Sequence, residues 1–328
     1  MMRSLYSGVS GLRNHQTRMD VIGNNIANVN TVGYKTSRTT FQDIFSQTAS
    51  GGSANQGYIG GTNPMQIGLG IKLGTVDVLH TPAPMARTDN PYDMMVEGDG
   101  YFILATELDA DGFGSSFLYT RAGNFYMDNE GYLVSSHGYY VMAYSAYPEF
   151  YDLNELDPDD PDYSDTPGDY GVVFSEIDTD DKLRRIQLRV VNNAYDGVDD
   201  PTDPDYEGPP FIDLVGFSVG QDGSISVIYE NEKRVIGMLG LGMFSNPNGL
   251  EKAGNSLYRA GPSSGEVVFE VALRNGAGRV NGGGLEMSNV DLASEFTDMI
   301  VTQRGFQANS RIITVSDSML EELVNLKR

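Results

Sequence analysis

The sequence contains no cysteine and no tryptophan among its 328 residues. Without cysteine the chain has no disulfide, no thiol nucleophile and no thiolate ligand for a metal. Basic residues are also scarce, with 22 Lys and Arg against 45 Asp and Glu, which gives a formal net charge of −23. Because binding to phosphates requires clustered Lys and Arg, this balance argues against nucleic acid as a partner.

Long apolar runs are missing as well. No stretch of about 18 consecutive apolar residues occurs, so no segment is predicted to insert into a membrane. The opening residues MMRSLYSGVSGL contain neither a continuous apolar core nor a small-residue cleavage site, so a cleaved secretory signal is not expected. The chain is therefore expected to be cytoplasmic, or to be exported by a route that needs no cleaved signal peptide.

Motifs for catalysis and for cofactor binding are not found. His15, His80 and His137 lie far apart, and none has the spacing of a metal ligand. The glycine-rich segments 68–74 (GLGIKLG) and 276–282 (GAGRVNG) are one residue too long for the dinucleotide-binding fingerprint. No serine lies in a nucleophile elbow. We therefore predict no catalytic residue, no cofactor and no enzyme activity.

Acidic loops raise the alternative of a calcium site. An EF-hand loop requires glycine at its sixth position. In loops that start at Asp157 and Asp196, that position holds Asp162 and Pro201. A solvated acidic loop is therefore favoured over a calcium site, and no metal site is predicted.

Apolar residues recur at helical spacing at both ends of the chain. The N-terminal set is Leu5, Val9, Leu12, Met19, Ile22, Ile26 and Val29. The C-terminal set is Leu292, Phe296, Met299, Ile300, Phe306, Ile312, Ile313, Met319, Leu320, Leu323 and Val324. Each set contains a step of seven residues, which predicts a seam facing another helix. Packing of each stripe on a globular core is the alternative, but two such helices in one chain favour pairing with each other.

The helix ends carry recognisable signals. The first helix is predicted to reach about Val29 and to leave through a turn at Gly33, which suits a positive φ. The second is predicted to start at Ser288, with Asp291 three residues on in a capping-box pattern, and to run to about Leu326.

The stretch IGNNIANVNTVGYK (22–35) is rich in residues that disfavour helices. Asn24, Asn25 and Asn28 carry amides that both donate and accept hydrogen bonds, so they become useful where helices meet and can bond across the interface. A helix of this composition is predicted to be weak alone and to gain its stability from neighbours.

The middle of the chain is predicted to be β-rich, with short strands and turns such as 128–131 and 221–223. Two stretches break this rhythm. Residues 46–70 are rich in Gly, Ser, Asn and Gln and indicate a linker or a long extended loop. Residues 147–214 hold 20 Asp and Glu against 4 Lys and Arg, with eight of the fourteen prolines, and indicate an inserted, surface-exposed module.

Several motifs resemble one known family. Residues 19–35, MDVIGNNIANVNTVGYK, are similar to the N-terminal signature of the bacterial flagellar rod and hook proteins, and residues 288–328 are similar to their C-terminal helix. Segments 96–104, 119–141 and 244–265 resemble middle blocks of the same family. The resemblance covers the chain apart from 147–214. Within the family, the first 48 residues most resemble hook proteins of Gram-positive bacteria, and a distal rod subunit is the alternative.

The resemblance implies an α+β fold with paired long N- and C-terminal helices, a β-rich outer domain and an inserted acidic β/loop module. Residues 1–35 and 287–328 would form a coiled-coil-like inner domain that lines a channel. Residues 36–75 would connect it to a β-rich domain of residues 76–146 and 215–286, and 147–214 would be the outermost insertion.

The implied function is a structural subunit of the flagellar hook, a helical tubular homopolymer that transmits torque as a universal joint. Its partners would be further copies, the distal rod protein, the hook cap protein, the hook–filament junction protein and the flagellar type III export apparatus. The protein would be extracellular, in the hook or basal body. The residues expected to carry assembly are Leu5, Val9, Leu12, Met19, Ile22, Asn24, Asn25, Ile26, Asn28, Gly33, Tyr34, Leu292, Phe296, Met299, Phe306, Ile313 and Leu320. A secreted adhesin or calcium-binding module is the rival class.

Overall fold

The computed structural model describes residues 2–55, 57–58, 60–109, 112–145, 148–152, 170–174, 183–188, 214–229 and 232–326. The chain forms two compact units. The first, here termed the helical unit, comprises Met1–Thr31, Lys35–Thr81 and Ser288–Arg328. The second, termed the β unit, comprises Val32–Tyr34 and Pro82–Met287.

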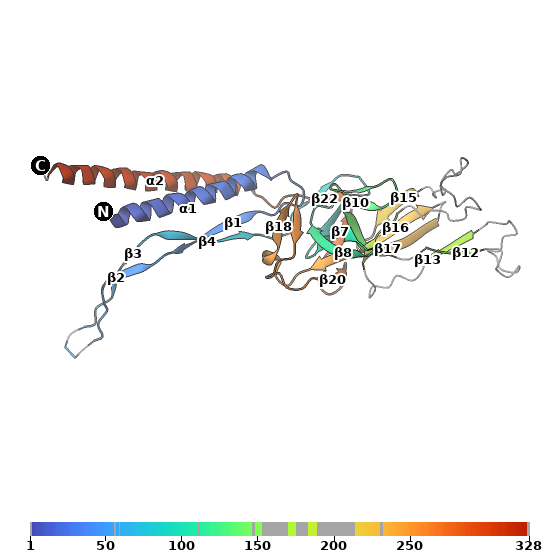
Figure 1. The fold of residues 1–328 in the computed structure, drawn as a ribbon, viewed down its shortest axis with the longest axis horizontal. Coiled ribbons are helices and arrows are strands. Elements are labelled where there is room, and N and C mark those ends of the chain that lie inside the picture. Colours follow the sequence, from blue (N-terminus) through green and yellow to red (C-terminus); the bar gives the residue numbers. More distant parts are fainter. Residues whose placement is uncertain are drawn as a thin grey trace. The chain divides into compact units, whose positions relative to one another are not determined.

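The helical unit contains the two long helices α1 (Met2–Ala27) and α2 (Leu292–Asn325). They lie side by side in opposite directions, so the two chain ends meet at one end of this unit (Figure 1). This arrangement confirms the predicted pairing of the two helices, whereas several residues of the predicted apolar seam, among them Val9, Leu292 and Phe296, are exposed. Helix α1 ends two residues before the expected Val29, where Thr31 N–H donates to the Asn28 carbonyl in a turn.

The predicted start of α2 is wrong. Asp291, not Ser288, is the N-cap, and its carboxylate accepts hydrogen bonds from the backbone N–H groups of Ala293 and Ser294. Ser288 lies outside the helix, where its hydroxyl accepts from Val290 N–H. An aspartate directly before the first helical residue reaches the free N–H groups of the first turn, so the residue expected to complete the capping box is itself the cap.

A long antiparallel arm completes the helical unit. Strand β1 (Ser37–Asp43) pairs with β4 (Ile71–Val78), and β2 (Ser46–Ser50) pairs with β3 (Met65–Gly68). The prediction of a loop over 46–70 is therefore wrong at both ends of that segment. These strands are mostly exposed and rich in Ser, Thr, Gln and Gly, so they lack the alternation that reveals a strand in sequence.

The β unit is built from short strands. They are β5 (Met85–Arg87), β6 (Met94–Glu97), β7 (Tyr101–Leu108), β8 (Gly114–Thr120), β9 (Phe125–Met127), β10 (Leu133–Ser135), β11 (Tyr140–Ser145), β12 (Pro148–Asp152), β13 (Tyr170–Phe174), β14 (Arg184–Arg185), β15 (Leu214–Val219), β16 (Ser224–Tyr229), β17 (Glu232–Met243), β18 (Glu251–Gly254), β19 (Leu257–Arg259), β20 (Val268–Val271), β21 (Arg279–Gly282) and β22 (Gly284–Glu286), with a short 3-10 helix η2 (Pro247–Gly249). Within the described residues, the main sheet has the order β15-β16-β17-β11-β7-β8-β19-β18.

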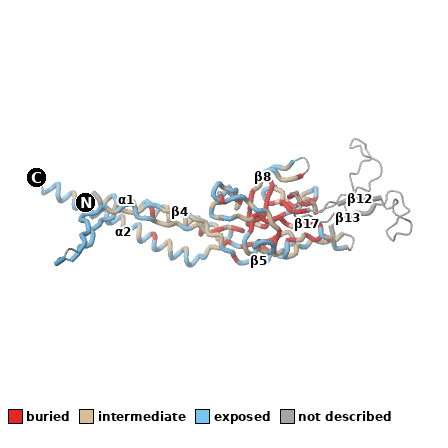
Figure 2. Tube along the Cα trace, turned by 90° about the horizontal axis from the view of Figure 1, so that it is seen from below, coloured by how far each residue is buried: buried red, intermediate tan, exposed pale blue. Residues whose placement is uncertain are grey.

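This pattern confirms the predicted β-rich middle. Asp128 and Gly131 close the turn between β9 and β10, because Gly131 N–H donates to the Asp128 carbonyl. A second predicted turn, 221–223, joins β15 to β16. Buried residues concentrate in the β unit (Figure 2), where the rings of Phe102 and Phe125 meet edge to face at 5.1 Å.

The acidic segment 147–214 is only partly described. Strands β12 and β13 pair with each other, whereas 153–169, 175–182 and 189–213, including both loops considered for calcium, lie outside the described residues. The prediction of surface exposure is wrong for 183–188, because Leu183, Ile186 and Leu188 are buried in the cores of the β unit. Their apolar side chains join the buried clusters that also contain residues of β11, the strand with which β14 pairs.

Candidate assembly surface

Helices α1 and α2 approach each other through glycines. A Cβ on Gly11 would meet the side-chain amide of Asn309 at 2.5 Å, and one on Gly305 would meet the ring of His15 at 2.8 Å. A Cβ on Gly8 would meet the Ile313 side chain at 3.4 Å, an ordinary contact distance. Only glycine fits at the two tighter positions without movement of the partner, so close approach depends on small residues rather than on a continuous leucine seam.

Polar bonds fix the register of the pair. The guanidinium of Arg18 lies 3.0 Å from the Asp298 carboxylate. The side chain of Asn25, only 1% exposed, donates to the Glu295 carboxylate at 3.0 Å. Burial raises the pKa of Glu295 above its ordinary value, while the bond from Asn25 acts in the opposite direction.

Asparagine amides also join α1 to the arm. Asn25 donates to the Ser37 carbonyl at 2.8 Å and accepts from Ser37 N–H at 3.0 Å. Its side-chain amide therefore makes the same pair of hydrogen bonds that the backbone of a neighbouring strand would make. Asn14, also buried, donates to the Ile71 carbonyl at 2.9 Å. These bonds satisfy backbone groups that β1 and β4 leave unpaired on that side. The prediction that asparagines bond across an interface therefore holds for Asn25.

The other residues of the asparagine-rich stretch behave differently. Asn28 donates to the Asn24 side chain and carbonyl within one turn, so cross-interface bonding by Asn28 is not found. Gly33 is buried in the β unit at φ +67°, where a Cβ would meet Ala122 N at 2.7 Å. The ring of Tyr34 lies 5.1 Å from the Lys252 ammonium.

The remaining predicted residues fall into three classes. Ile22 is buried. Half-buried positions are Leu5, Leu12, Met19, Ile26, Met299, Ile313 and Leu320. Exposed positions are Val9, Leu292, Phe296 and Phe306.

A second apolar stripe runs along α2 and is exposed. Its residues are Ile312, Val315, Met319, Leu323 and Leu326. Their spacing of three and four residues places them on one helix face, about a quarter turn from the face that meets α1. Met319 is 50% exposed and Leu326 is 83% exposed. We term this set the exposed stripe. Periodicity alone does not separate this surface from the predicted seam, because Ile312, Met319 and Leu323 fit the same helical spacing.

A groove lies between α1 and the arm. It encloses about 400 Å³, and its apolar lining consists of Tyr6, Val9, Ile44, Leu69, Ile71 and Leu73. Its polar lining consists of Ser10, Arg13, Asn14 and Lys72. Tyr6 and Ile44 are also strongly exposed, so the residues that the structure describes leave apolar surface in the groove uncovered. We term it the arm groove.

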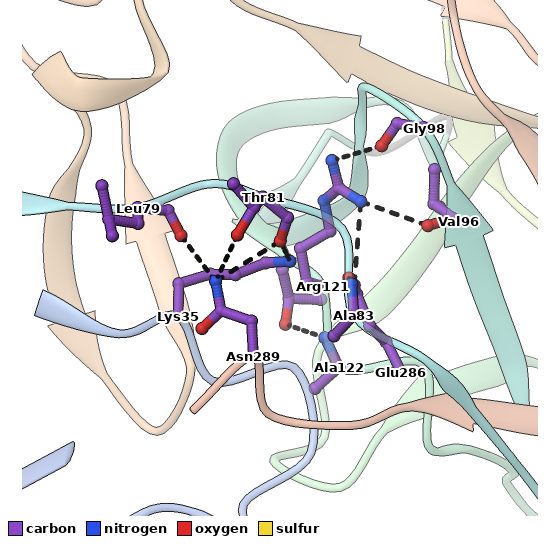
Figure 3. Close-up of polar contacts among 11 residues, drawn as sticks. Lys35, Leu79, Thr81, Ala83, Val96, Gly98, Arg121, Ala122, Glu286 and Asn289 are labelled. Atoms are coloured by element: carbon purple, nitrogen blue, oxygen red, sulfur yellow. Dashed lines mark hydrogen bonds and ion pairs between the residues drawn. The ribbon is translucent and has the colours of Figure 1, made fainter. Parts of the chain in front are cut away.

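Buried charges organise each unit separately (Figure 3). In the helical unit, Lys35 is fully buried and donates to the Thr81 carbonyl at 2.7 Å, while Asn289 donates to the Leu79 carbonyl at 2.9 Å. In the β unit, Arg121 donates to the carbonyls of Val96 and Gly98, as Figure 3 shows.

Glu286 is the acidic partner of Arg121, at 3.7 Å, and both side chains are buried. Glu286 also accepts from Ala83 N–H at 3.2 Å. Such a pair is costly to break, because removal of one partner strands the other charge.

Within the described residues, no group of three or more His, Asp and Glu side chains could hold a metal ion. None of the described helices is long and apolar enough to cross a membrane.

Comparisons with known families agree along the chain. The family described as "Flagella basal body rod protein" matches residues 5–35, and "Flagellar hook protein FlgE/F/G D1 domain" matches 95–227. "Flagellar basal body rod FlgEFG protein C-terminal" matches 281–326. All three descriptions are of structural flagellar proteins.

Individual relatives cover the whole chain. The chain is 42% identical over 330 residues to the flagellar basal-body rod protein FlgG of Bacillus subtilis, with all of both chains covered. It is 32% identical over 448 residues to the flagellar hook protein FlgE of Borreliella burgdorferi, again with both chains covered. Among solved structures, the Helicobacter pylori flagellar hook protein FlgE2 covers 62% of this chain and 100% of its own at 12% identity, with a TM-score of 0.35.

Proposed function

The chain belongs to the bacterial flagellar rod and hook protein family, and from this premise we propose that it is a structural subunit that self-assembles into the helical tube of the flagellar hook. The hook would act as a universal joint that transmits torque from the rod to the filament. Its partners would be its own copies, the distal rod protein below, the hook cap and junction proteins above, and the flagellar export apparatus.

The observation that carries the proposal is the uncovered apolar surface of the helical unit. Large apolar side chains on α2, such as Phe296, Ile300 and Val315, are about half exposed, although monomeric proteins rarely leave such contiguous apolar surface in water. At roughly 25 cal/mol per Å² of buried apolar area, covering these side chains by neighbouring copies provides a strong driving force for assembly.

We assign the parts of the chain to the tube accordingly. The paired helices, residues 1–35 and 287–328, would line the central channel, and the segment 36–75 would bridge towards the outer domain and contact adjacent subunits. The β-rich residues 76–146 and 215–286 would form the wall, with the acidic segment outermost. Export without a cleaved signal is part of this proposal.

The hook position is supported by the resemblance of the first 48 residues to hook proteins of Gram-positive bacteria. The higher percentage identity to the rod protein FlgG than to the hook protein FlgE does not argue against the hook position. The two alignments differ in length, and 42% of 330 residues and 32% of 448 residues each amount to about 140 identical positions.

The distal rod is the second candidate. The alignment with the rod protein FlgG spans 330 residues, close to the 328 residues of this chain, whereas the alignment with the hook protein FlgE of Borreliella burgdorferi spans 448. This match in length favours the rod.

Electron microscopy of basal bodies from a strain that lacks this gene distinguishes the two positions. Complete rods without hooks are the expected result. Truncated rods would contradict the hook assignment and support the rod. Intact hooks and rods would contradict both.

A further inference from the structure

The chain contains three Asn-Gly steps, at 248–249, 275–276 and 281–282. Such steps are prone to spontaneous deamidation, because glycine has no Cβ that keeps its backbone nitrogen away from the asparagine side chain. We propose that Asn275-Gly276 is a deamidation site of the folded protein, restrained by one hydrogen bond to Glu270, and that the fold protects the other two steps. This inference does not depend on the proposed function.

Asn275 and Gly276 form the exposed tip of the turn between β20 and β21. Their φ angles are +47° and +86°, as at the central residues of a type I′ turn, and Ala277 N–H donates to the Arg274 carbonyl at 2.8 Å. A flip of the peptide unit between Asn275 and Gly276 changes ψ of the first residue and φ of the second, and it keeps this hydrogen bond. Because glycine tolerates either sign of φ, the rotation that closes a five-membered ring is available here.

Few contacts hold the central peptide unit of this turn. A Cβ added to Gly276 would meet nothing within 4 Å. Among the residues that the structure describes, no group accepts a hydrogen bond from Gly276 N–H. The side-chain amide of Asn275 donates to the Glu270 carboxylate at 2.7 Å. Both residues of the step are exposed, so water and hydroxide can reach them.

The other two Asn-Gly steps are held by their surroundings. Gly249 N–H donates to the Asn246 carbonyl in η2, and a Cβ on Gly249 would lie 2.5 Å from the Ser263 backbone. Asn281 and Gly282 lie in β21, where both pair with residues of β6. Rotation of either peptide unit would break these contacts, so ring closure at these two steps requires local unfolding.

The reaction needs only water and hydroxide. The Gly276 nitrogen loses its proton to hydroxide and attacks Cγ of Asn275, which closes a succinimide ring, and the side-chain nitrogen takes a proton from water and leaves as ammonia. Water then adds to one of the two ring carbonyls, and the C–N bond at that carbonyl breaks. Opening at Cγ gives aspartate, and opening at the main-chain carbonyl gives isoaspartate. Either product adds a carboxylate to the turn beside Glu270.

Peptide mass spectrometry of the full-length chain after incubation at mildly alkaline pH tests this assignment. The two other Asn-Gly steps are internal controls, and an isoaspartyl methyltransferase detects isoaspartate. In the folded chain, the expected rate at Asn275 is at least about tenfold higher than at Asn248 or Asn281. In denaturant the three rates should become similar, because the dipeptide is the same in each case. Equal rates in the folded chain, or a faster reaction at Asn248 or Asn281, would overturn the proposal.

A variant of Glu270 tests the restraint. Glu270→Ala removes the hydrogen bond to the Asn275 amide and should raise the rate at Asn275 by about two- to tenfold, the factor that one net hydrogen bond represents. The matched control is Glu266→Ala, which removes an exposed carboxylate from the segment before β20 and should leave the rate unchanged. An unchanged or lower rate in Glu270→Ala would overturn the restraint assigned to Glu270.

Discussion

The two units of this protein differ in what they bury. The β unit buries large apolar side chains in two hydrophobic clusters, the larger of which contains Phe102, Phe125 and Leu239. In the helical unit the buried positions are mostly glycines, asparagines, hydroxyls and Lys35, with Ile22 as a buried apolar side chain, and its other described large apolar side chains are half-buried or exposed. The β unit is therefore stabilised by its own interior, whereas the helical unit is positioned by polar bonds and has its apolar surface available for neighbours.

This difference separates two roles that a polymer subunit must combine. A self-sufficient core lets the chain remain folded before it meets another copy. An uncovered apolar surface then supplies the free energy of assembly, because it is removed from water only in the polymer. The following changes test whether the two units divide the roles in this way.

The largest effect is expected in the core of the β unit. Phe102→Ala removes a fully buried ring that packs on Phe125, and should lower the free energy of unfolding of this unit by about 3–5 kcal/mol. Denaturant unfolding followed by tyrosine fluorescence measures it. The matched control is Tyr126→Ala. Tyr126 follows Phe125 in β9, but its ring is exposed, so its truncation should change the free energy of unfolding by about 0.5 kcal/mol or less. Equal losses in both variants would contradict the core assigned to this unit.

The next largest effect is expected at Gly33. Alanine there would adopt a positive φ and place its Cβ against the backbone of Arg121 and Ala122, so Gly33→Ala should cost about 2–4 kcal/mol. The control is Gly138→Ala, which has a similar φ of +80° but nothing within 4 Å of the new Cβ, and should cost about 1–2 kcal/mol. Thermal unfolding of the two variants measures both losses of stability. Gly138→Ala gives the cost of a positive φ alone, and the additional loss in Gly33→Ala is the cost of the steric contact with Arg121 and Ala122.

A smaller effect is expected at Asn25 in the helical unit. Asn25→Ala removes the bonds to Ser37 and Glu295 and should destabilise this unit by about 1–3 kcal/mol, because buried backbone groups lose their partners. The exposed Asn30, changed to alanine, is the control. Circular dichroism of the helices during unfolding measures both. An unchanged melting curve for Asn25→Ala would show that the amide bonds do not hold the arm to α1.

The smallest effect is expected from His15. Partial burial, and secondarily the charge of Arg18, lowers the pKa of His15 below its ordinary value of 6.5. Its ring lies between Gly305 and Phe41, with no hydrogen-bond partner for Nδ1. The unfolded chain therefore binds the proton more readily, and helical-unit stability should fall as the pH decreases through 6.5.

The control for this pH dependence is His15→Gln, which should make helical-unit stability nearly independent of pH between about 7.5 and 5.5. This range lies above the ordinary pKa values of Asp and Glu, about 3.9 and 4.3, so most carboxylates do not titrate within it. A wild-type profile that is already flat would contradict the burial of a neutral imidazole between the helices.

Much of this arrangement follows from periodicity in the sequence. The steps of seven from Leu5 and from Leu292 predict two helices and their pairing, because a repeated apolar face requires a partner. Alternation predicts strands of the β unit such as β16, and glycine-containing turns mark their ends. These patterns involve residues close together in sequence, so they can be identified without knowledge of the tertiary structure.

The remainder depends on long-range partners that leave no local pattern. Strands β2 and β3 are polar and exposed, so nothing in 46–70 distinguishes a hairpin arm from a linker. The roles of Asn14 and Asn289 come from carbonyls more than fifty residues away in sequence. Residues 183–188 lie within an acidic stretch, and their burial is decided by pairing with β11. The exposed stripe and the seam overlap in sequence, because the adjacent Ile312 and Ile313 belong to different faces of α2.

Hydrogen exchange before and after polymerisation tests the division between the units most directly. The account predicts that protection of backbone amides in α2, above all around Val315 to Leu326, rises sharply in the polymer, while the core strands β7 and β17 change little because they are already protected. Protection that rises only in the β unit, with α2 unchanged, would contradict the claim that the helical unit carries the assembly surface.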